Sequence, residues 1–193
     1  MSKIAIFGGS FDPVHRSHIQ LVKFVLELSC NFKKVIFVIA YTSPHKSKQY
    51  ANVDDRIAML KIATEGLPRT EISLYEVLKK KVIYSYQTLD YFQSLYPGDE
   101  IYMIIGSDSL LELHTWKNID YLASRYKFVV VKRPYIKIKK DVKYLDRCII
   151  VQNETENISS TEIRQMIKED SKKFELFLDK KVYNYIVKRR LYK

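Results

Sequence analysis

No apolar run in this sequence is long enough to cross a membrane. The longest, residues 35–40 and 128–131, have only the length of a strand, whereas a membrane-spanning helix needs about 20 apolar residues. We also expect no signal peptide, because the turn from Gly8 to Asp12 interrupts the N-terminal apolar stretch too early. We therefore expect a protein of the cytoplasm.

Cysteine is scarce as well. Cys30 and Cys148 lie in apolar stretches and form neither a CxxC pair nor a spacing typical of metal ligands. Isolated thiols of this kind are common in reducing compartments. We expect both thiols to be buried.

Acidic residues are too few to balance the basic ones. There are 22 of the former and 33 of the latter, so the formal net charge is +11. Such a charge suits polyanionic ligands, which include nucleotides as well as nucleic acids. The interleaved aromatic and basic residues of a single-strand stacking surface are absent, so nucleic-acid binding is disfavoured and a solvated basic surface is expected.

Repeats, low-complexity segments and linkers are also absent, and 193 residues suffice for one domain with a proper core. Buried strands and amphipathic helices alternate along the chain. Strands are predicted at 3–7, 33–40, 71–77, 100–105, 127–132 and 147–152, and helices at 17–29, 53–65, 85–95, 107–124 (as short pieces), 160–168 and 180–190.

This alternation predicts an α/β fold, a Rossmann-like doubly wound parallel sheet covered by helices on both faces. We expect residues 1–193 to form a single domain, with about 153–193 as a small C-terminal helical region of it. Ligands of such sheets bind beyond the carboxyl ends of the strands, where the strand order reverses.

The first candidate site follows the first strand. Gly8 and Gly9 end that strand, Ser10 and Phe11 continue the turn, and a helix begins near Ser17. Glycine lets backbone approach a phosphate, and the free N–H groups of a helix N-terminus attract anions. The turn lacks both the GxGxxG and the P-loop fingerprints, and a tight turn alone would also explain the glycine pair.

His15 and His18 stand where that anion would bind. Zinc is disfavoured, because it needs a third ligand and usually an i, i+4 histidine pair. Two interpretations remain: the histidines cap the helix or lie on the surface, or both donate hydrogen bonds to a phosphate whose negative charge grows in a transition state.

Further candidates follow other strand ends and so belong at the same edge of the sheet. Lys46 closes the segment SPHK after the second strand, Gly106 and Asp108 follow the fourth strand, and Arg133 follows the fifth. A plain turn is the alternative for the first of these, and an N-cap is the alternative for Asp108.

The segment ISSTEIR opens a late helix. Ser159 and Glu162 fit a capping box, but capping does not explain the run of hydroxyls with Arg164 one turn further on. Helical N–H groups, the hydroxyls of Ser159, Ser160 and Thr161, and a guanidinium together suit a polyphosphate.

In chain order, GGSFDPVHRSH, SPHK, GSD, Trp116, KRP and ISSTEIR resemble the HxGH nucleotidyltransferases, and among them the bacterial nicotinate-nucleotide adenylyltransferases. The likeness runs from residue 3 to the C-terminus. It implies transfer of AMP from ATP to nicotinate mononucleotide, giving nicotinate adenine dinucleotide and pyrophosphate in NAD biosynthesis. It further implies direct in-line attack with no covalent enzyme intermediate, and Mg²⁺ that is held through the ATP phosphates rather than by protein ligands.

The resemblance also implies roles for the residues that match its motifs. The implied catalytic residues are His15, His18, Lys46 and Arg164. The implied ATP-binding residues are Gly8, Gly9, Ser10, Phe11, His15, His18, Gly106, Asp108, Ser159, Ser160, Thr161 and Arg164. The implied nicotinate mononucleotide-binding residues are Ser10, Phe11, Lys46, Thr88, Asp108, Trp116 and Arg133.

Three positions depart from the family pattern: Ser17 replaces the glycine of HxGH, Ser43 replaces a common proline, and Ser107 replaces an alanine or threonine. Nicotinamide mononucleotide and phosphopantetheine are alternative acceptors. A non-catalytic nucleotide-binding module is the alternative from another class. A homo-oligomer with an interface in the Lys- and Tyr-rich C-terminal region is left open.

Overall fold

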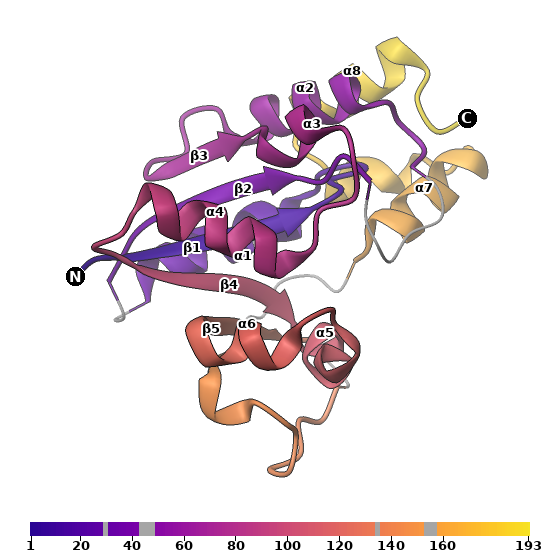
Figure 1. Ribbon diagram of the computed structural model, residues 1–193. Helices are drawn as coiled ribbons and strands as arrows, with labels where there is room; N and C mark the ends of the chain where they lie inside the picture. Colours follow the sequence, from indigo (N-terminus) through magenta and orange to yellow (C-terminus); the bar gives the residue numbers. More distant parts are fainter. Residues whose placement is uncertain (29–30, 43–48, 134–135, 153–157) are drawn as a thin grey trace.

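The computed structural model describes residues 1–28, 31–42, 49–133, 136–152 and 158–193. Six parallel strands form one sheet in the order β3-β2-β1-β4-β5-β6, with helices on both faces (Figure 1). The strands are β1 (Lys3–Gly9), β2 (Phe32–Ile39), β3 (Thr70–Ser73), β4 (Glu100–Gly106), β5 (Lys127–Lys132) and β6 (Cys148–Gln152). The predicted doubly wound parallel sheet is confirmed, and the strand order reverses between β1 and β4.

The helices are α1 (Arg16–Glu27), α2 (Val53–Thr64), α3 (Tyr75–Lys79), α4 (Ser85–Leu95), α5 (Ser107–Leu111), α6 (Ile119–Arg125), α7 (Ser160–Lys168) and α8 (Lys180–Arg189). Three 3-10 turns, η1 (Leu113–Thr115), η2 (Leu145–Arg147) and η3 (Lys172–Phe177), complete the described elements. The predicted bounds of α4, β5 and α7 are the observed ones, and most others differ by one or two residues.

Two hydrophobic cores lie on opposite faces of the sheet. Successive residues of a strand point to opposite faces, so Ala5 of β1 packs into the core beneath α1, α2, α7 and α8, whereas Ile4 and Ile6 pack into the core beneath α4, α5 and α6. Both faces of the central strands are therefore buried, which is why β1 and β2 are nearly continuous apolar runs.

The predicted strand at 71–77 is wrong in its second half. β3 ends at Ser73, whose hydroxyl accepts a hydrogen bond from the Tyr75 N–H at 3.2 Å, and the chain turns into α3. Leu74 and Val77 both pack against the first core. Their spacing of three suits one face of a helix, and this longer-range packing overrides the apparent strand alternation.

The prediction of two buried thiols is also wrong for Cys148, which is only partly buried at the start of the edge strand β6. Burial still raises the pKa of this thiol, to about 11. Cys30 lies outside the described residues. In the part of the chain that the structure describes, no helix is both long and apolar enough to span a membrane.

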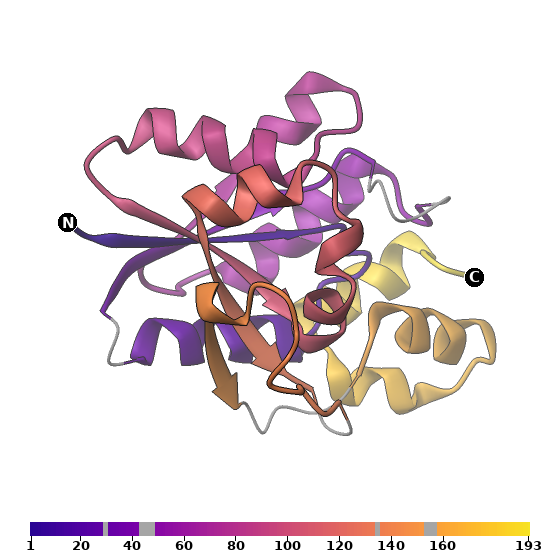
Figure 2. The same ribbon diagram turned by 60° about the horizontal axis from the view of Figure 1, so that its bottom comes forward.

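The C-terminal segment packs against the main body of the protein. α8 lies beside α2 (Figure 1), where the Tyr185 hydroxyl donates to the Asp55 carboxylate at 2.8 Å. Figure 2 shows α7 and the segment that follows it beyond the end of the sheet toward which β1 points. Hydrophobic residues of both helices, among them Ile163 and Val182, belong to the first core.

The last turn of the chain is tied to the loop after β1. Past α8, Arg190 adopts a left-handed conformation, and the buried Tyr192 donates its hydroxyl hydrogen to Asp12 Oδ1 at 2.8 Å. Asp12 is buried and also accepts hydrogen bonds from the N–H groups of Tyr50 (2.8 Å) and Ala51 (3.1 Å). One carboxylate thus joins three segments that are distant in sequence.

Replacing Tyr192 with phenylalanine should lower the free energy of unfolding by about 1.5–3 kcal/mol, because a buried carboxylate loses one of its donors. Urea denaturation followed by circular dichroism measures this change. The matched control is Tyr121→Phe, since the Tyr121 hydroxyl also bonds an aspartate, Asp90, but at an exposed position. The control should change stability by less than about 0.5 kcal/mol. Equal losses in the two variants would contradict the role given to Tyr192.

Candidate active site

A cavity of about 360 Å³ opens between the carboxyl ends of β1 and β4, at the reversal of strand order. Its wall includes residues from the ends of both strands, from the start of α4 and from the segment after β5. Eight of the residues singled out from the sequence line it: Gly8, Gly9, Ser10, Thr88, Gly106, Asp108, Trp116 and Arg133. The structure therefore brings together residues that are up to 125 positions apart (8 to 133).

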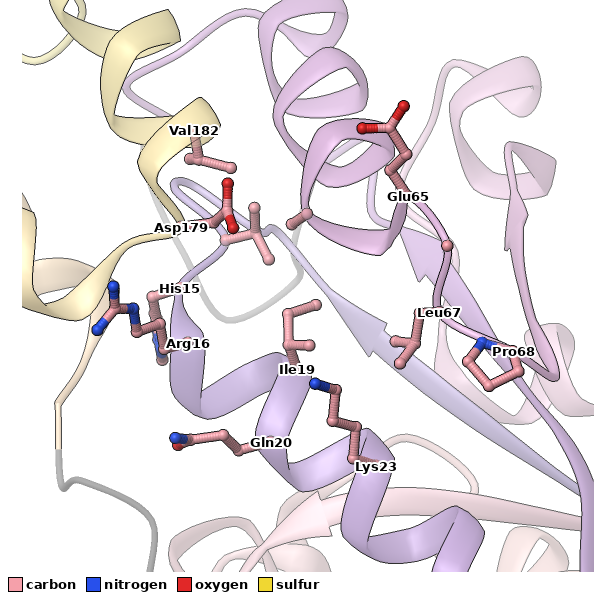
Figure 3. Close-up of a pocket in the computed structure, with 13 residues that line it drawn as sticks. His15, Arg16, Ile19, Gln20, Lys23, Glu65, Leu67, Pro68, Asp179 and Val182 are labelled. Atoms are coloured by element: carbon pink, nitrogen blue, oxygen red, sulfur yellow. The ribbon is translucent and has the colours of Figure 1, made fainter.

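A second hollow, of about 450 Å³, lies on the other side of α1, between that helix, the turn after α2 and the start of α8 (Figure 3). Of the residues singled out from the sequence, it reaches only His15. Neighbouring Arg16 donates from Nε to the Leu178 carbonyl at 2.9 Å and so ties the start of α1 to the C-terminal region. The cavity at the strand reversal is the better candidate for chemistry.

The turn after β1 is closely packed. A Cβ atom on Gly9 would lie 3.1 Å from the ring of Phe11, which is closer than side chains normally approach. Phe11 itself has a φ of 48°, a left-handed conformation that costs a non-glycine residue about 1–3 kcal/mol. Its buried ring packs edge-on against Phe7, Phe37 and His18, which holds the turn in this shape.

The two histidines cap α1 and also stack on each other. His15 is the N-cap residue, and its backbone N–H donates to His18 Nδ1 at 3.2 Å. The ring centroids lie 3.7 Å apart. Because Nδ1 of His18 accepts this bond, its neutral ring carries the proton on Nε2, so capping also sets the tautomer. The capping and the phosphate interpretations are therefore compatible.

His15 is a neutral group at physiological pH. Burial lowers its pKa to about 4; the nearby charge of Arg133 acts in the same direction, and Glu162 opposes it. Its Nδ1 is buried and has no hydrogen-bond partner among the described residues. An unpaired buried polar atom costs about 1–3 kcal/mol, and such atoms are common where a ligand completes the site.

The start of α7 is joined to the turn after β1. Ser160 Oγ donates to the Pro13 carbonyl at 2.9 Å, and the buried Arg164 donates from Nη1 to the Asp12 carbonyl at 2.7 Å. Arg164 also donates to Thr161 Oγ1 at 3.1 Å. Arg164 and the α7 hydroxyls thus lie beside the histidines, although they do not line the cavity.

The predicted capping box of α7 is present. The Ser159 hydroxyl accepts from the Glu162 N–H at 3.2 Å, and Glu162 Oε2 accepts from the Ser159 N–H at 2.8 Å. This pair accounts for the helix start, as the local alternative required. It does not account for the positions of Ser160 and Arg164. Those positions follow from the contacts of the two residues with the turn after β1.

The segment after β4 is built around an ion pair. Asp108 Oδ1 lies 3.3 Å from Arg133 Nε, and both side chains are about half exposed. Gly106 is the N-cap of α5, so Asp108 is not, and the capping alternative for it is wrong. A Cβ atom on Gly106 would clash with Asp108 Oδ1, so a side chain at this position would force the Asp108 carboxylate to move.

Ser107 has a structural role that the sequence did not reveal. It is fully buried, and its hydroxyl oxygen accepts a hydrogen bond from the backbone N–H of Arg133 at 3.0 Å. The hydroxyl therefore joins the ends of β4 and β5 and fixes the backbone that carries the cation. Alanine at this position would lack that bond.

Trp116, Thr88 and Glu76 also line the cavity. Trp116 is partly buried and packs against the second core, so its core and ligand interpretations are both compatible with its position. Thr88 is buried, and its hydroxyl donates to Glu76 Oε1 at 2.7 Å. Ser85, the first residue of α4, also lines the cavity.

Arg56 packs behind the turn after β1 and is another residue whose structural role the sequence did not reveal. It is fully buried in α2, where its Nη1 donates to the carbonyls of Ser10 (2.9 Å) and Ala40 (2.7 Å). It thus holds together the chain just after β1 and β2. A single arginine in an amphipathic helix is normally a surface residue, so no local signal distinguishes it.

The SPHK segment, from Ser43 to Lys46, lies outside the described residues, as does Pro134. Ser17 is a buried residue in the first turn of α1. The described candidates thus form two adjoining groups. One lines the cavity, and the other surrounds the start of α1 and α7, where the charge of Arg133 reaches His15.

Comparison with known proteins supports this arrangement. The model of the cytidylyltransferase-like family matches residues 6–166. A protein of Endomicrobium trichonymphae, named a probable nicotinate-nucleotide adenylyltransferase, is 64% identical over 194 residues and aligns over 100% of both chains. A protein of Clostridium tetani with the same name is 36% identical over 208 residues, again over 100% of both chains.

Among solved structures, the nicotinic acid mononucleotide adenylyltransferase of Plasmodium falciparum complexed with NaAD matches with a TM-score of 0.83 and 23% identity. The match covers 100% of this chain and 98% of the other. The likeness at this identity concerns the fold. Together with the family match and the full-length relatives, it shows that the chain belongs to the nicotinate-nucleotide adenylyltransferases of the cytidylyltransferase-like family.

Proposed function

We propose that this protein transfers the adenylyl group of ATP to nicotinate mononucleotide, giving nicotinate adenine dinucleotide and pyrophosphate, a step of NAD biosynthesis. The observation that carries the proposal is the single turn after β1, which joins the cavity at the strand reversal to the histidines of α1 and to Arg164 of α7. The names of the full-length relatives support the same reaction.

The chemistry requires positioning and charge stabilisation. A phosphate oxygen of the mononucleotide attacks the α-phosphorus of ATP in line, the bond from that phosphorus to the bridging oxygen breaks, and pyrophosphate leaves with the bonding electrons. Both substrates are anionic, so preorganised donors and cations lower the barrier by compensating the charge that develops.

The turn after β1 and the starts of α1 and α7 are assigned to ATP. His18, which carries its proton on Nε2, is placed at the α-phosphate, and neutral His15 contributes a polar contact beside it. Ser159, Ser160, Thr161 and Arg164 are assigned to the polyphosphate, with the helix N-terminus adding its N–H groups. The guanidinium of Arg164, which the Asp12 carbonyl already holds in place, is assigned to contact the polyphosphate.

The cavity is assigned to the pyridine mononucleotide. Trp116 stacks on the ring, Thr88 and its neighbours form the wall, and Arg133 meets the phosphate. Asp108 is placed at a ribose, whose hydroxyls donate to its carboxylate. Ser10 and Phe11 stand between the two substrates, and Lys46 adds a second cation.

Mg²⁺ is proposed to arrive with ATP. In the described part of the chain, no group of three or more histidine, cysteine, aspartate or glutamate side chains could hold a metal ion. Phosphate oxygens and water are the ligands that Mg²⁺ prefers, so the donor set fits an ion held through the nucleotide. When bound, this ion compensates charge on the phosphates.

Four parts of the expectation are left to experiment. Nicotinamide mononucleotide and phosphopantetheine are the alternative acceptors, and a non-catalytic nucleotide-binding module is the alternative class. A homo-oligomer and a cytoplasmic location also remain proposals.

The reaction itself is the first test. Purified protein with ATP, Mg²⁺ and nicotinate mononucleotide should release pyrophosphate, which a coupled phosphate assay measures, and omitting either substrate should abolish the signal. Turnover of phosphopantetheine without turnover of either pyridine mononucleotide would contradict the substrate assignment. Salt-dependent DNA binding with no turnover would support the non-catalytic alternative.

Replacing His18 with alanine should lower kcat on the order of 100-fold, the scale for losing one donor to a developing charge. Steady-state pyrophosphate release measures the change. His114→Ala is the matched control, because this histidine is exposed and its Nδ1 lies 3.1 Å from the nearby Leu111 carbonyl oxygen. The control should retain the wild-type rate. A near wild-type kcat for the His18 variant would remove this residue from the catalytic centre.

Replacing Gly106 with alanine should weaken substrate binding, because the new methyl group must displace the Asp108 carboxylate and so disturb its pairing with Arg133. We expect KM to rise on the order of tenfold, which corresponds to about 1.4 kcal/mol. Gly98→Ala is the control, since nothing lies within 4 Å of a Cβ atom there. If both variants keep the wild-type KM, Asp108 does not bind substrate.

A further inference from the structure

Glu76 is a buried acid in the wall of the candidate pyridine cavity. It lies in the short helix α3, is 9% exposed, and lines the cavity together with Trp116 and Thr88. The proposed reaction assigns no role to this residue. A buried carboxyl group needs an explanation, because burying its charged form without a counter-ion is costly.

Among the described residues, the Glu76 carboxyl has one side-chain hydrogen-bond donor and no cation within ion-pair distance. Thr88 Oγ1 donates to Oε1 at 2.7 Å, and in the described part of the chain no lysine, arginine or histidine forms an ion pair with this carboxyl. Burial raises the pKa of Glu76 to about 7, and the bond from Thr88 opposes this shift. Both protonation states are therefore populated near neutral pH.

The other ionisable groups around Glu76 are engaged elsewhere. On its own helix, Tyr75 stacks on Tyr91 of α4, with ring centroids 3.8 Å apart, and Lys79 lies over the Tyr75 ring. At the ends of β4 and β5, Asp108 and Arg133 pair with each other.

The remaining charged group of α4, Asp90, accepts hydrogen bonds from the hydroxyls of Tyr121 and Tyr126. In the described part of the chain, Glu76 is thus the carboxyl of the cavity wall whose charge has no partner of opposite sign.

We propose that Glu76 is a specificity-determining residue that distinguishes pyridine mononucleotides by their ring substituent: the protonated acid admits the carboxylate of nicotinate, and the ionised form disfavours it. The inference rests on the proposed function. Two carboxylates in close contact at a buried position cannot both remain ionised at low cost. A protonated Glu76 can instead donate its hydrogen to the substrate carboxylate, with a strong charge-assisted bond.

The amide of nicotinamide has the opposite preference. Its NH₂ group can donate to an ionised Glu76 and has no charge to be repelled. Preference for nicotinate over nicotinamide mononucleotide should therefore fall as the pH rises. When nicotinate mononucleotide binds to protein in which Glu76 is ionised, Glu76 must also take up one proton from solution.

The test is the ratio of kcat/KM for nicotinate mononucleotide to kcat/KM for nicotinamide mononucleotide between pH 6 and pH 8. The phosphate groups of the two substrates ionise alike, so their effect cancels in the ratio. In the wild-type protein the ratio should fall at least about tenfold, following the fraction of protonated Glu76. Glu76→Gln, a neutral isostere, should keep the ratio within about twofold over this range.

The control is Glu175→Gln, which removes an exposed carboxylate of η3 and should follow the wild-type pH trend. A pH-independent ratio in the wild type, or the same pH dependence in Glu76→Gln, would overturn the inference. No turnover of either mononucleotide at any pH would overturn the proposed function instead.

A second measurement covers a glutamine variant that fails to fold. Calorimetry of the wild-type protein at pH 8, in two buffers of different ionisation enthalpy, counts the protons that each mononucleotide takes up. We expect close to one proton for nicotinate mononucleotide and none for nicotinamide mononucleotide. Equal proton uptake for the two ligands would overturn the role of Glu76.

Discussion

The buried carboxylate of Asp12 is the interaction on which the candidate site depends. Its oxygens accept hydrogen bonds from the N–H groups of Tyr50 and Ala51 and from the Tyr192 hydroxyl, and its backbone carbonyl accepts one from Arg164. Four segments of the chain therefore meet at one residue. An acid buried among fewer donors would cost several kcal/mol, so the turn after β1 has its observed shape only when the segment before α2, helix α7 and the C-terminus are all in place.

This dependence also marks the limit of prediction from the sequence. Strands such as β5 and helices such as α4 follow from local apolar periodicity, and the capping box of α7 follows from a spacing of three residues. The partners of Asp12 lie 38 to 180 positions away, so no local pattern could have identified them. The second half of the strand expected at 71–77 failed for a related reason, because packing against a distant core determined the conformation there.

The electrostatics of the site differ from what a net charge of +11 suggests. The cationic groups of the described site, Arg133 and Arg164, are held by an aspartate and by a backbone carbonyl. The histidine beside them is neutral, because burial and the charge of Arg133 lower its pKa. Selectivity for phosphate would thus come from a few oriented donors, while the excess of surface lysines adds general attraction for anions.

Ser17 in place of the motif glycine can be judged in the same terms. A side chain at this position would harm phosphate binding only if it projected over the N–H groups that open α1. Ser17 is instead buried within the protein, in the turn that His15 caps. Because its atoms are covered from solvent by neighbouring residues, they do not stand in the space that a ligand approaching the helix N-terminus would occupy. The departure is therefore compatible with the anion site that the rest of the turn forms.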